Sequence, residues 1–126
     1  MSGKLKGKKV LVTGSGTGLG REIALEFARQ GADVVLHYAH SAEGAESAVK
    51  EIQMMGRKTT AIKADLRDVN QAIKLASDAE GFLGGLDVLV NNAGVTMTLE
   101  FEKVTPEQFD TLYDVNVRSP YFIIQT

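Results

Sequence analysis

The chain has 126 residues, roughly the size of one domain, and its 44% hydrophobic and 24% charged residues are ordinary for a packed protein, so disordered and fibrous classes are excluded. Lys and Arg number 14 against 16 Asp and Glu, and the formal net charge of -2 gives no reason to expect nucleic acid or an anionic membrane as a partner.

Cysteine is absent, which excludes thiolate chemistry. The histidines are only His37 and His40, so we expect no metal site. No apolar run approaches the roughly 18 residues of a membrane span, and no leader-like apolar segment follows the first lysines, so we expect a soluble, cytoplasmic protein.

Short apolar runs alternate with amphipathic segments along the chain. Each run rich in Val, Leu and Ile predicts a buried strand, and apolar residues three or four positions apart predict a helix. Glycine, serine, aspartate and proline mark the borders between these elements. In chain order we predict a strand at Lys8–Thr13, a helix at Gly18–Gln30, a strand at Val34–Tyr38, a helix capped by Ser41 and ending at Gly56, a strand at Lys58–Ala64, a helix capped by Asp68 in a capping box with Gln71 and reaching Phe82, a strand at Asp87–Val90, and a last helix that starts at Thr105-Pro106-Glu107-Gln108 and includes Ile123.

This alternation predicts an α/β fold. Strands so apolar are buried on both faces, which requires a parallel sheet with helices on each side and right-handed crossovers. We therefore expect residues 1–126 to form part of a doubly wound, Rossmann-type sheet, the type in which the first four strands have the order 3-2-1-4.

A glycine-rich loop, Thr13–Gly20, joins the first strand to the first helix. Gly14, Gly16 and Gly18 have no Cβ to keep a ligand away from the N–H groups at the positive end of the helix dipole, so a diphosphate is expected there, while Gly20 lets the helix lie close to the sheet. The spacing is T-G-x-x-x-G-x-G; it fits neither G-x-G-x-x-G nor the triphosphate-binding loop. A tight turn without a ligand is the alternative.

Four motifs occur in an order and spacing that is similar to a known family along the whole chain. The loop at Thr13–Gly20 is followed by Asp65-Leu66 after the third strand, Asn91-Asn92-Ala93-Gly94 after the fourth, and Asn116 in the last helix. The set resembles the short-chain dehydrogenase/reductase family, most closely its reductases of 3-oxoacyl thioesters and its sugar or polyol dehydrogenases. The resemblance implies an NAD(P)-dependent oxidoreductase that moves hydride between nicotinamide and a carbonyl or secondary alcohol, and a homotetramer when complete.

The resemblance also implies a role for each motif. Asp65 would accept from the adenine amino group while the Leu66 N–H donates to the ring, unless Asp65 is only a solvated turn residue. Asn92, Ala93 and Gly94 would pass under the adenosine ribose, unless they form an ordinary turn. The residues implied along the diphosphate and the adenosine ribose are Gly14, Ser15, Gly16, Thr17, Gly18 and Leu19.

Asn116 resembles the asparagine of the family's Asn-Ser-Tyr-Lys catalytic set. In a helix its carbonyl would accept from residue 120, which is proline and has no N–H. A carbonyl freed in this way can recruit a water for a proton relay. The alternative is that Pro120 simply kinks or ends the helix.

The end of the second strand bears on the choice of cofactor. NAD sites commonly place a carboxylate there, but this chain has Tyr38, which leaves a 2′-phosphate without like-charge repulsion. Ser41 and the start of the next helix could donate to that phosphate, and His40 is either a phosphate ligand or a solvated residue. Against this, Thr17 stands where the family's NADP enzymes often have a basic residue. We expect NADP in preference to NAD.

No Tyr-x-x-x-Lys occurs in the sequence, although the family's tyrosine acts as general acid–base. We therefore expect this chain to be the amino-terminal part of a longer enzyme and to be inactive alone. The alternative is a dinucleotide-binding module without turnover. A methyl transferase on a similar sheet would also want a carboxylate where Tyr38 stands, and it leaves the matches at Asn91–Gly94 and Asn116 unexplained.

Overall fold

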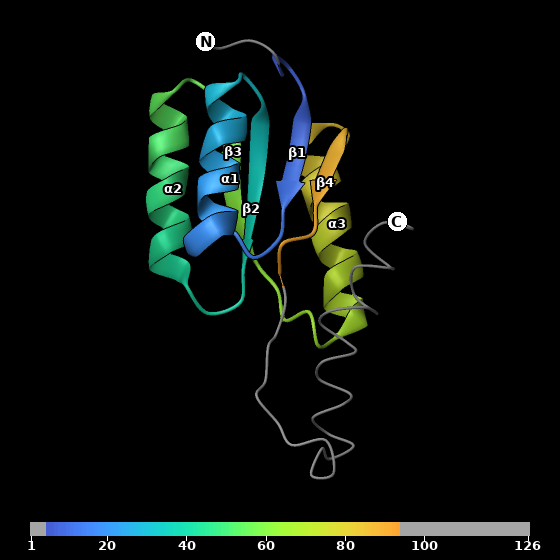
Figure 1. The fold of residues 1–126 in the computed structure, drawn as a ribbon. Coiled ribbons are helices and arrows are strands. Elements are labelled where there is room, and N and C mark those ends of the chain that lie inside the picture. Colours follow the sequence, from blue (N-terminus) through green and yellow to red (C-terminus); the bar gives the residue numbers. More distant parts are fainter. Residues whose placement is uncertain (1–4, 94–126) are drawn as a thin grey trace.

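The computed structural model describes residues 5–93, and the fold is an α/β structure in which strands and helices alternate (Figure 1). Gly94, Asn116 and the predicted last helix lie outside the described residues. The other seven predicted elements are confirmed, with ends that differ by a residue or a few. They are β1 (Lys9–Val12), α1 (Gly18–Arg29), β2 (Asp33–Tyr38), α2 (Ala42–Met54), β3 (Thr59–Lys63), α3 (Val69–Leu83) and β4 (Val88–Val90).

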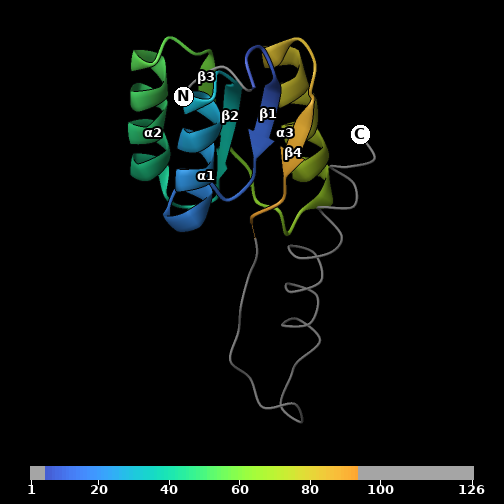
Figure 2. The same ribbon diagram turned by 45° about the horizontal axis from the view of Figure 1, so that its top comes forward.

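The strands form one parallel sheet in the order β3-β2-β1-β4, as predicted. In its register Val12 lies beside Leu36 of β2 and beside Val90 of β4. The helices α1 and α2 cover one face and α3 covers the other, and a second view shows the three layers (Figure 2).

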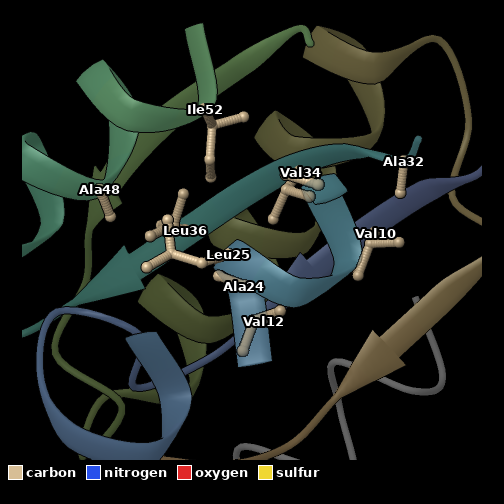
Figure 3. Close-up of a cluster of buried hydrophobic side chains, with 10 residues drawn as sticks. Val10, Val12, Ala24, Leu25, Ala32, Val34, Leu36, Ala48 and Ile52 are labelled. Atoms are coloured by element: carbon tan, nitrogen blue, oxygen red, sulfur yellow. The ribbon is translucent and has the colours of Figure 1, made fainter. Parts of the chain in front are cut away.

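Two hydrophobic clusters hold these layers together because successive strand residues point to opposite faces. On the α3 side, Leu11 and Val35 pack against small residues of the helix such as Ala72 and Ala76. The other face carries the larger cluster (Figure 3), in which the sheet residues meet α1 and α2. Each fully buried Val, Leu or Ile contributes roughly 1.5–3 kcal/mol. The members of this larger cluster that Figure 3 labels are Val10, Val12, Ala24, Leu25, Ala32, Val34, Leu36, Ala48 and Ile52.

Two helix starts differ from the sequence prediction. Ser41 is the N-cap of α2, but its side chain makes no capping hydrogen bond, because its backbone (φ -98°, ψ 61°) is not in the extended conformation usual at this position. Asp68 caps α3 by accepting from the Asn70 N–H at 2.9 Å, and no bond from Gln71 back to the Asp68 N–H completes the predicted capping box. The Gln71 amide oxygen instead accepts from the Asp65 N–H at 2.8 Å.

Because the strands are parallel, their carboxyl ends meet at one edge of the sheet. After β1 the chain continues through α1 on one face of the sheet to β2, on one side of β1. The chain reaches β4, on the other side of β1, through α3 on the opposite face. This change of direction between β1 and β4 opens a crevice at the carboxyl edge, the place where open α/β sheets bind ligands.

Candidate functional site

An open cavity of about 600 Å³ lies at the carboxyl edge of the sheet. It is built from the loops after all four strands, so residues far apart in the sequence share one wall. Its lining comprises Gly14, Gly16, Thr17, Gly18, Leu19, His37, Tyr38, Ala39, His40, Ser41, Asp65, Leu66, Arg67, Asn92 and Ala93.

The glycine loop lies tightly against its neighbours. Gly14 has a φ of +63°, and a Cβ there would come within 2.8 Å of the Ala93 Cα. At Gly16 a Cβ would come within 2.9 Å of the Ser41 carbonyl oxygen. The floor of the cavity at these two positions is therefore bare backbone, which lets a ligand approach the peptide groups themselves.

Ser15 lies behind this surface instead of lining it. The residue is fully buried and is absent from the cavity wall. Its hydroxyl donates to the Val12 carbonyl at 2.7 Å and accepts from the His37 N–H at 2.9 Å, and its own N–H donates to the His37 carbonyl. The structure thus places the Ser15 side chain away from the predicted diphosphate, where it fastens the loop to β2.

Thr13 joins the loop to the end of β4. Its hydroxyl oxygen accepts from the backbone N–H groups of Asn92 and Ala93, both at 3.1 Å. The Asn92 side-chain amide donates to the Gly14 carbonyl, also at 3.1 Å. The predicted grouping of Asn92 and Ala93 with the glycine loop is therefore present, and the short side chain of Ala93 is what allows Gly14 to lie so close.

Asp65 is engaged by a neighbour that the sequence analysis did not single out. The Arg67 guanidinium donates to both carboxylate oxygens, with the shortest contact at 2.7 Å. These hydrogen bonds lower the pKa of Asp65 from 3.8 to about 2, and the charge of His40 acts in the same direction. Asp65 is consequently an ionised hydrogen-bond acceptor, and Arg67 brings a positive charge to the cavity wall.

The wall at the end of β2 holds Tyr38, Ala39, His40 and Ser41, so no carboxylate follows this strand within the cavity. Ser41 keeps its hydroxyl free of a capping bond. Leu19, in the first turn of α1, also lines the cavity and is 70% exposed.

Two further residues hold the start of α2 against the glycine loop. A Cβ at Gly44 would overlap the carbonyl oxygen of Gly16. The Arg21 side chain of α1 donates to the Gly44 carbonyl at 3.3 Å, to the Ser47 hydroxyl at 2.7 Å and to Glu51 at 2.9 Å. Sequence analysis missed both residues, since a glycine or an arginine inside a predicted helix gives no signal of what it contacts.

His37 is the other residue that the sequence analysis left without a functional role. One nitrogen of its ring lies 2.9 Å from the Ala64 carbonyl oxygen, beyond the end of β3. The other ring nitrogen accepts from the Gly14 N–H at 2.9 Å. Burial lowers the pKa of His37 below its usual 6.5. A polar residue inside an apolar strand was the available signal.

Within residues 5–93, no group of three His, Asp or Glu side chains is placed to hold a metal ion, and no helix is long and apolar enough to cross a membrane. The fold, with a glycine loop at its crevice, is an α/β structure of the doubly wound class, whose members bind ligands at this edge of the sheet. The family model for short chain dehydrogenase matches residues 8–126, and the chain belongs to this family.

Its relatives include a trihydroxynaphthalene reductase of Colletotrichum orbiculare, 43% identical over 97% of this chain and 43% of the relative. A short chain dehydrogenase of Burkholderia cenocepacia in complex with NADP superposes with a TM-score of 0.94 at 38% identity, over 97% of this chain and 50% of the other. The landomycin C-6 ketoreductase LanV, with bound NADP and rabelomycin, gives 0.86 at 41% identity, over 98% and 53%. This chain therefore spans about half the length of the proteins it matches.

Proposed function

We propose that this chain forms the cofactor-binding part of an NADP-dependent oxidoreductase that interconverts a carbonyl and a secondary alcohol. The observation that carries the proposal is the bare backbone of Gly14 and Gly16 on the wall of the crevice between β1 and β4, where no side chain of the loop stands between a diphosphate and the peptide groups. The dinucleotide, when bound, supplies or accepts the hydride. The residues of this chain bind and orient it.

The walls on either side suit the two ends of an adenosine group. Asp65, kept ionised by Arg67, is available to accept from an adenine amino group, next to the Leu66 backbone. The turn of Asn92 and Ala93 would lie under the ribose, held in place by Thr13. Thr17, Gly18 and Leu19 complete the loop side of the cavity, and Gly94, outside the described residues, would extend the ribose wall.

NADP is favoured over NAD by the end of β2. Tyr38 stands where a carboxylate would accept from the ribose hydroxyls of NAD, and the uncapped Ser41 hydroxyl and the His40 side chain line the same wall. The Arg67 guanidinium, although paired with Asp65, lines the same cavity and has further N–H groups that could donate to a 2′-phosphate. Two of the similar solved structures are complexes with NADP, which agrees with this choice.

The remaining parts of the proposal concern the whole protein. Asn116 would belong to the catalytic set, with its backbone carbonyl freed by Pro120 to hold a water for proton relay. We propose a homotetrameric, cytoplasmic enzyme acting on a small carbonyl or alcohol, with 3-oxoacyl and sugar or polyol compounds as candidate substrates. The names of the reductase of Colletotrichum orbiculare and of LanV add polycyclic aromatic ketones to the substrates worth testing.

Binding of the two reduced cofactors tests the proposal. We expect NADPH to bind more tightly than NADH, as measured by calorimetry and by the change in cofactor fluorescence. Tyr38→Asp should reverse the preference, because a carboxylate repels a 2′-phosphate and accepts from a 2′-hydroxyl. We expect about a tenfold loss of NADPH affinity, or about 1.4 kcal/mol.

Tyr38→Phe is the matched control, since it keeps the ring and adds no charge, and it should retain the preference for NADPH. Failure of the folded protein to bind either cofactor would refute dinucleotide binding. Tighter NADH binding by the unchanged protein would refute the NADP assignment alone. Binding of NADPH without turnover by the whole protein on any carbonyl would favour the non-catalytic module.

A further inference from the structure

His37 connects two of the loops that build the cavity. It lies two residues after Val35 in β2, so both side chains point to the face of the sheet that α3 covers, and it is only 2% exposed. The Gly14 N–H donates to its Nδ1 at 2.9 Å, and its Nε2 lies 2.9 Å from the Ala64 carbonyl oxygen. Gly14 opens the glycine loop and Ala64 immediately precedes Asp65, so one ring spans the proposed diphosphate and adenine sites.

The two partners select a single form of the ring. A backbone N–H only donates, so Nδ1 must present a lone pair to Gly14. A carbonyl only accepts, so Nε2 must carry the hydrogen that points at Ala64. Only the neutral ring with its hydrogen on Nε2 satisfies both contacts. A doubly protonated ring would place an N–H against the Gly14 N–H, and one of the two would have to move.

The surroundings offer little to a charged ring. In register with His37, β3 places Ile62 and the chain after β1 places Thr13, which carries no charge, while Lys63 at the end of β3 is exposed. The buried face of α3 is made of Ala and Leu. On its own strand the neighbour is Tyr38, and the other titratable groups of the cavity wall are His40 and the Asp65–Arg67 ion pair. The only carboxylate among these residues is thus already paired, and burial lowers the pKa of His37.

We propose that His37 is a positioning residue for the dinucleotide. Its neutral ring accepts from the Gly14 N–H and so holds the glycine loop in the shape that binds the dinucleotide, and protonation of the ring breaks this hydrogen bond and releases the loop. Nucleotide affinity then depends on pH through a buried side chain beneath the loop, in addition to any titration of the ligand. The proposal rests on the proposed nucleotide binding. It predicts a constant affinity above about pH 7 and a loss of up to tenfold per pH unit once His37 begins to protonate.

Two substitutions separate the ring's two contacts. His37→Asn keeps a polar oxygen near the position of Nδ1, so it can still accept from Gly14, but it cannot become charged. His37→Gln extends its amide toward the position of Nε2, so it can donate to Ala64 while it leaves Gly14 without its acceptor. We expect His37→Asn to bind within about threefold of the unchanged protein at pH 8, and His37→Gln to bind at least tenfold more weakly.

The decisive measurement is the dissociation constant of NADP⁺ by calorimetry from pH 5.5 to pH 8 for the three proteins. The 2′-phosphate itself titrates near pH 6, as phosphate monoesters do, but this contribution is common to all of them. The unchanged protein should lose affinity more steeply toward low pH than His37→Asn does. Equal slopes for the two proteins would overturn the proposal, and so would equal affinity of His37→Asn and His37→Gln at pH 8.

Nitrogen NMR of the ring in the free protein gives a readout that needs no nucleotide. We expect a neutral ring protonated on Nε2 at pH 7.5, and a Gly14 amide signal that shifts together with the ring as it titrates. A ring protonated on Nδ1, or a Gly14 signal that ignores the titration, would overturn the inference. If the protein binds no nucleotide but shows this coupled titration, the proposed function fails while the His37–Gly14 contact stands.

Discussion

Gly44 gives the sharpest test of how α2 and the glycine loop fit together. A methyl group at this position would overlap the Gly16 carbonyl oxygen, which is backbone and cannot rotate away as the end of a side chain could. Gly44→Ala gains helix propensity of at most about 1 kcal/mol. Forcing a methyl into a tightly packed contact typically costs about 1–3 kcal/mol. Because the methyl group would overlap backbone, we take the upper part of this range, and a cost of about 2–3 kcal/mol less the gain of about 1 kcal/mol gives a net loss of stability of about 1–2 kcal/mol.

Gly81→Ala is the matched control. Gly81 also lies inside a helix, α3, but a Cβ there meets no atom within 4 Å. The same chemical change should therefore raise stability by about 0.5–1 kcal/mol, through helix propensity alone. Urea denaturation followed by circular dichroism measures both variants, and the sign of the change should differ between them.

Gly44→Ala should also affect nucleotide binding, because Gly16 and Ser41, which line the cavity, both lie at the contact that Gly44 makes possible. We expect Gly44→Ala to weaken NADPH binding about tenfold, or about 1.4 kcal/mol, and Gly81→Ala to leave it unchanged. The reasoning is refuted if Gly44→Ala is as stable as Gly81→Ala and binds NADPH as tightly.

Two further predictions concern the walls of the cavity. Thr13→Val should destabilise the protein by about 1–3 kcal/mol in urea denaturation, because it removes the acceptor for the N–H groups of Asn92 and Ala93; Thr13→Ser, which keeps the hydroxyl, should lose much less. Arg67→Gln should raise the pKa of Asp65 from about 2 toward 3.8, measured by carboxyl-carbon NMR, and an unchanged value would show that Arg67 is not its cause. Since folding lowers this pKa, the ion pair stabilises the fold above about pH 3.8, and that contribution is lost as the pH falls toward 2.

The arrangement of elements could be predicted from the sequence because each signal for it is local. Apolar runs such as Val34–Leu36 mark strands that are buried on both faces, and the glycine loop marks the turn at the crevice. The alternation of strand and helix with right-handed crossovers gives a doubly wound sheet, and the order 3-2-1-4 within that class is the one typical of Rossmann-type sheets with a glycine loop after the first strand. Among the elements that residues 5–93 contain, only the ends shifted, as for the strand predicted at Lys58–Ala64 and found at Thr59–Lys63.

The polar contacts of the site could not be predicted in the same way, because their partners are distant in the sequence. His37 is 23 residues from Gly14 and 27 from Ala64, and periodicity shows which face a residue occupies without showing what it meets there. The helix caps failed for a related reason. Gln71 has the spacing of a capping box, but the Asp65 N–H competes for its side chain and accounts for its observed position.

The glycines of the loop show how a motif interpreted through its ligand can have a second physical basis. A Cβ at Gly14 would approach Ala93, and one at Gly20 would overlap the Gly14 carbonyl, so both positions are restricted by the protein's own backbone. Gly18 differs, since its Cβ would meet open space and only its φ of +57° favours glycine. Substitutions at Gly14 and Gly20 therefore disturb fold and binding together, because any ligand meets a surface whose shape the protein's internal contacts already determine.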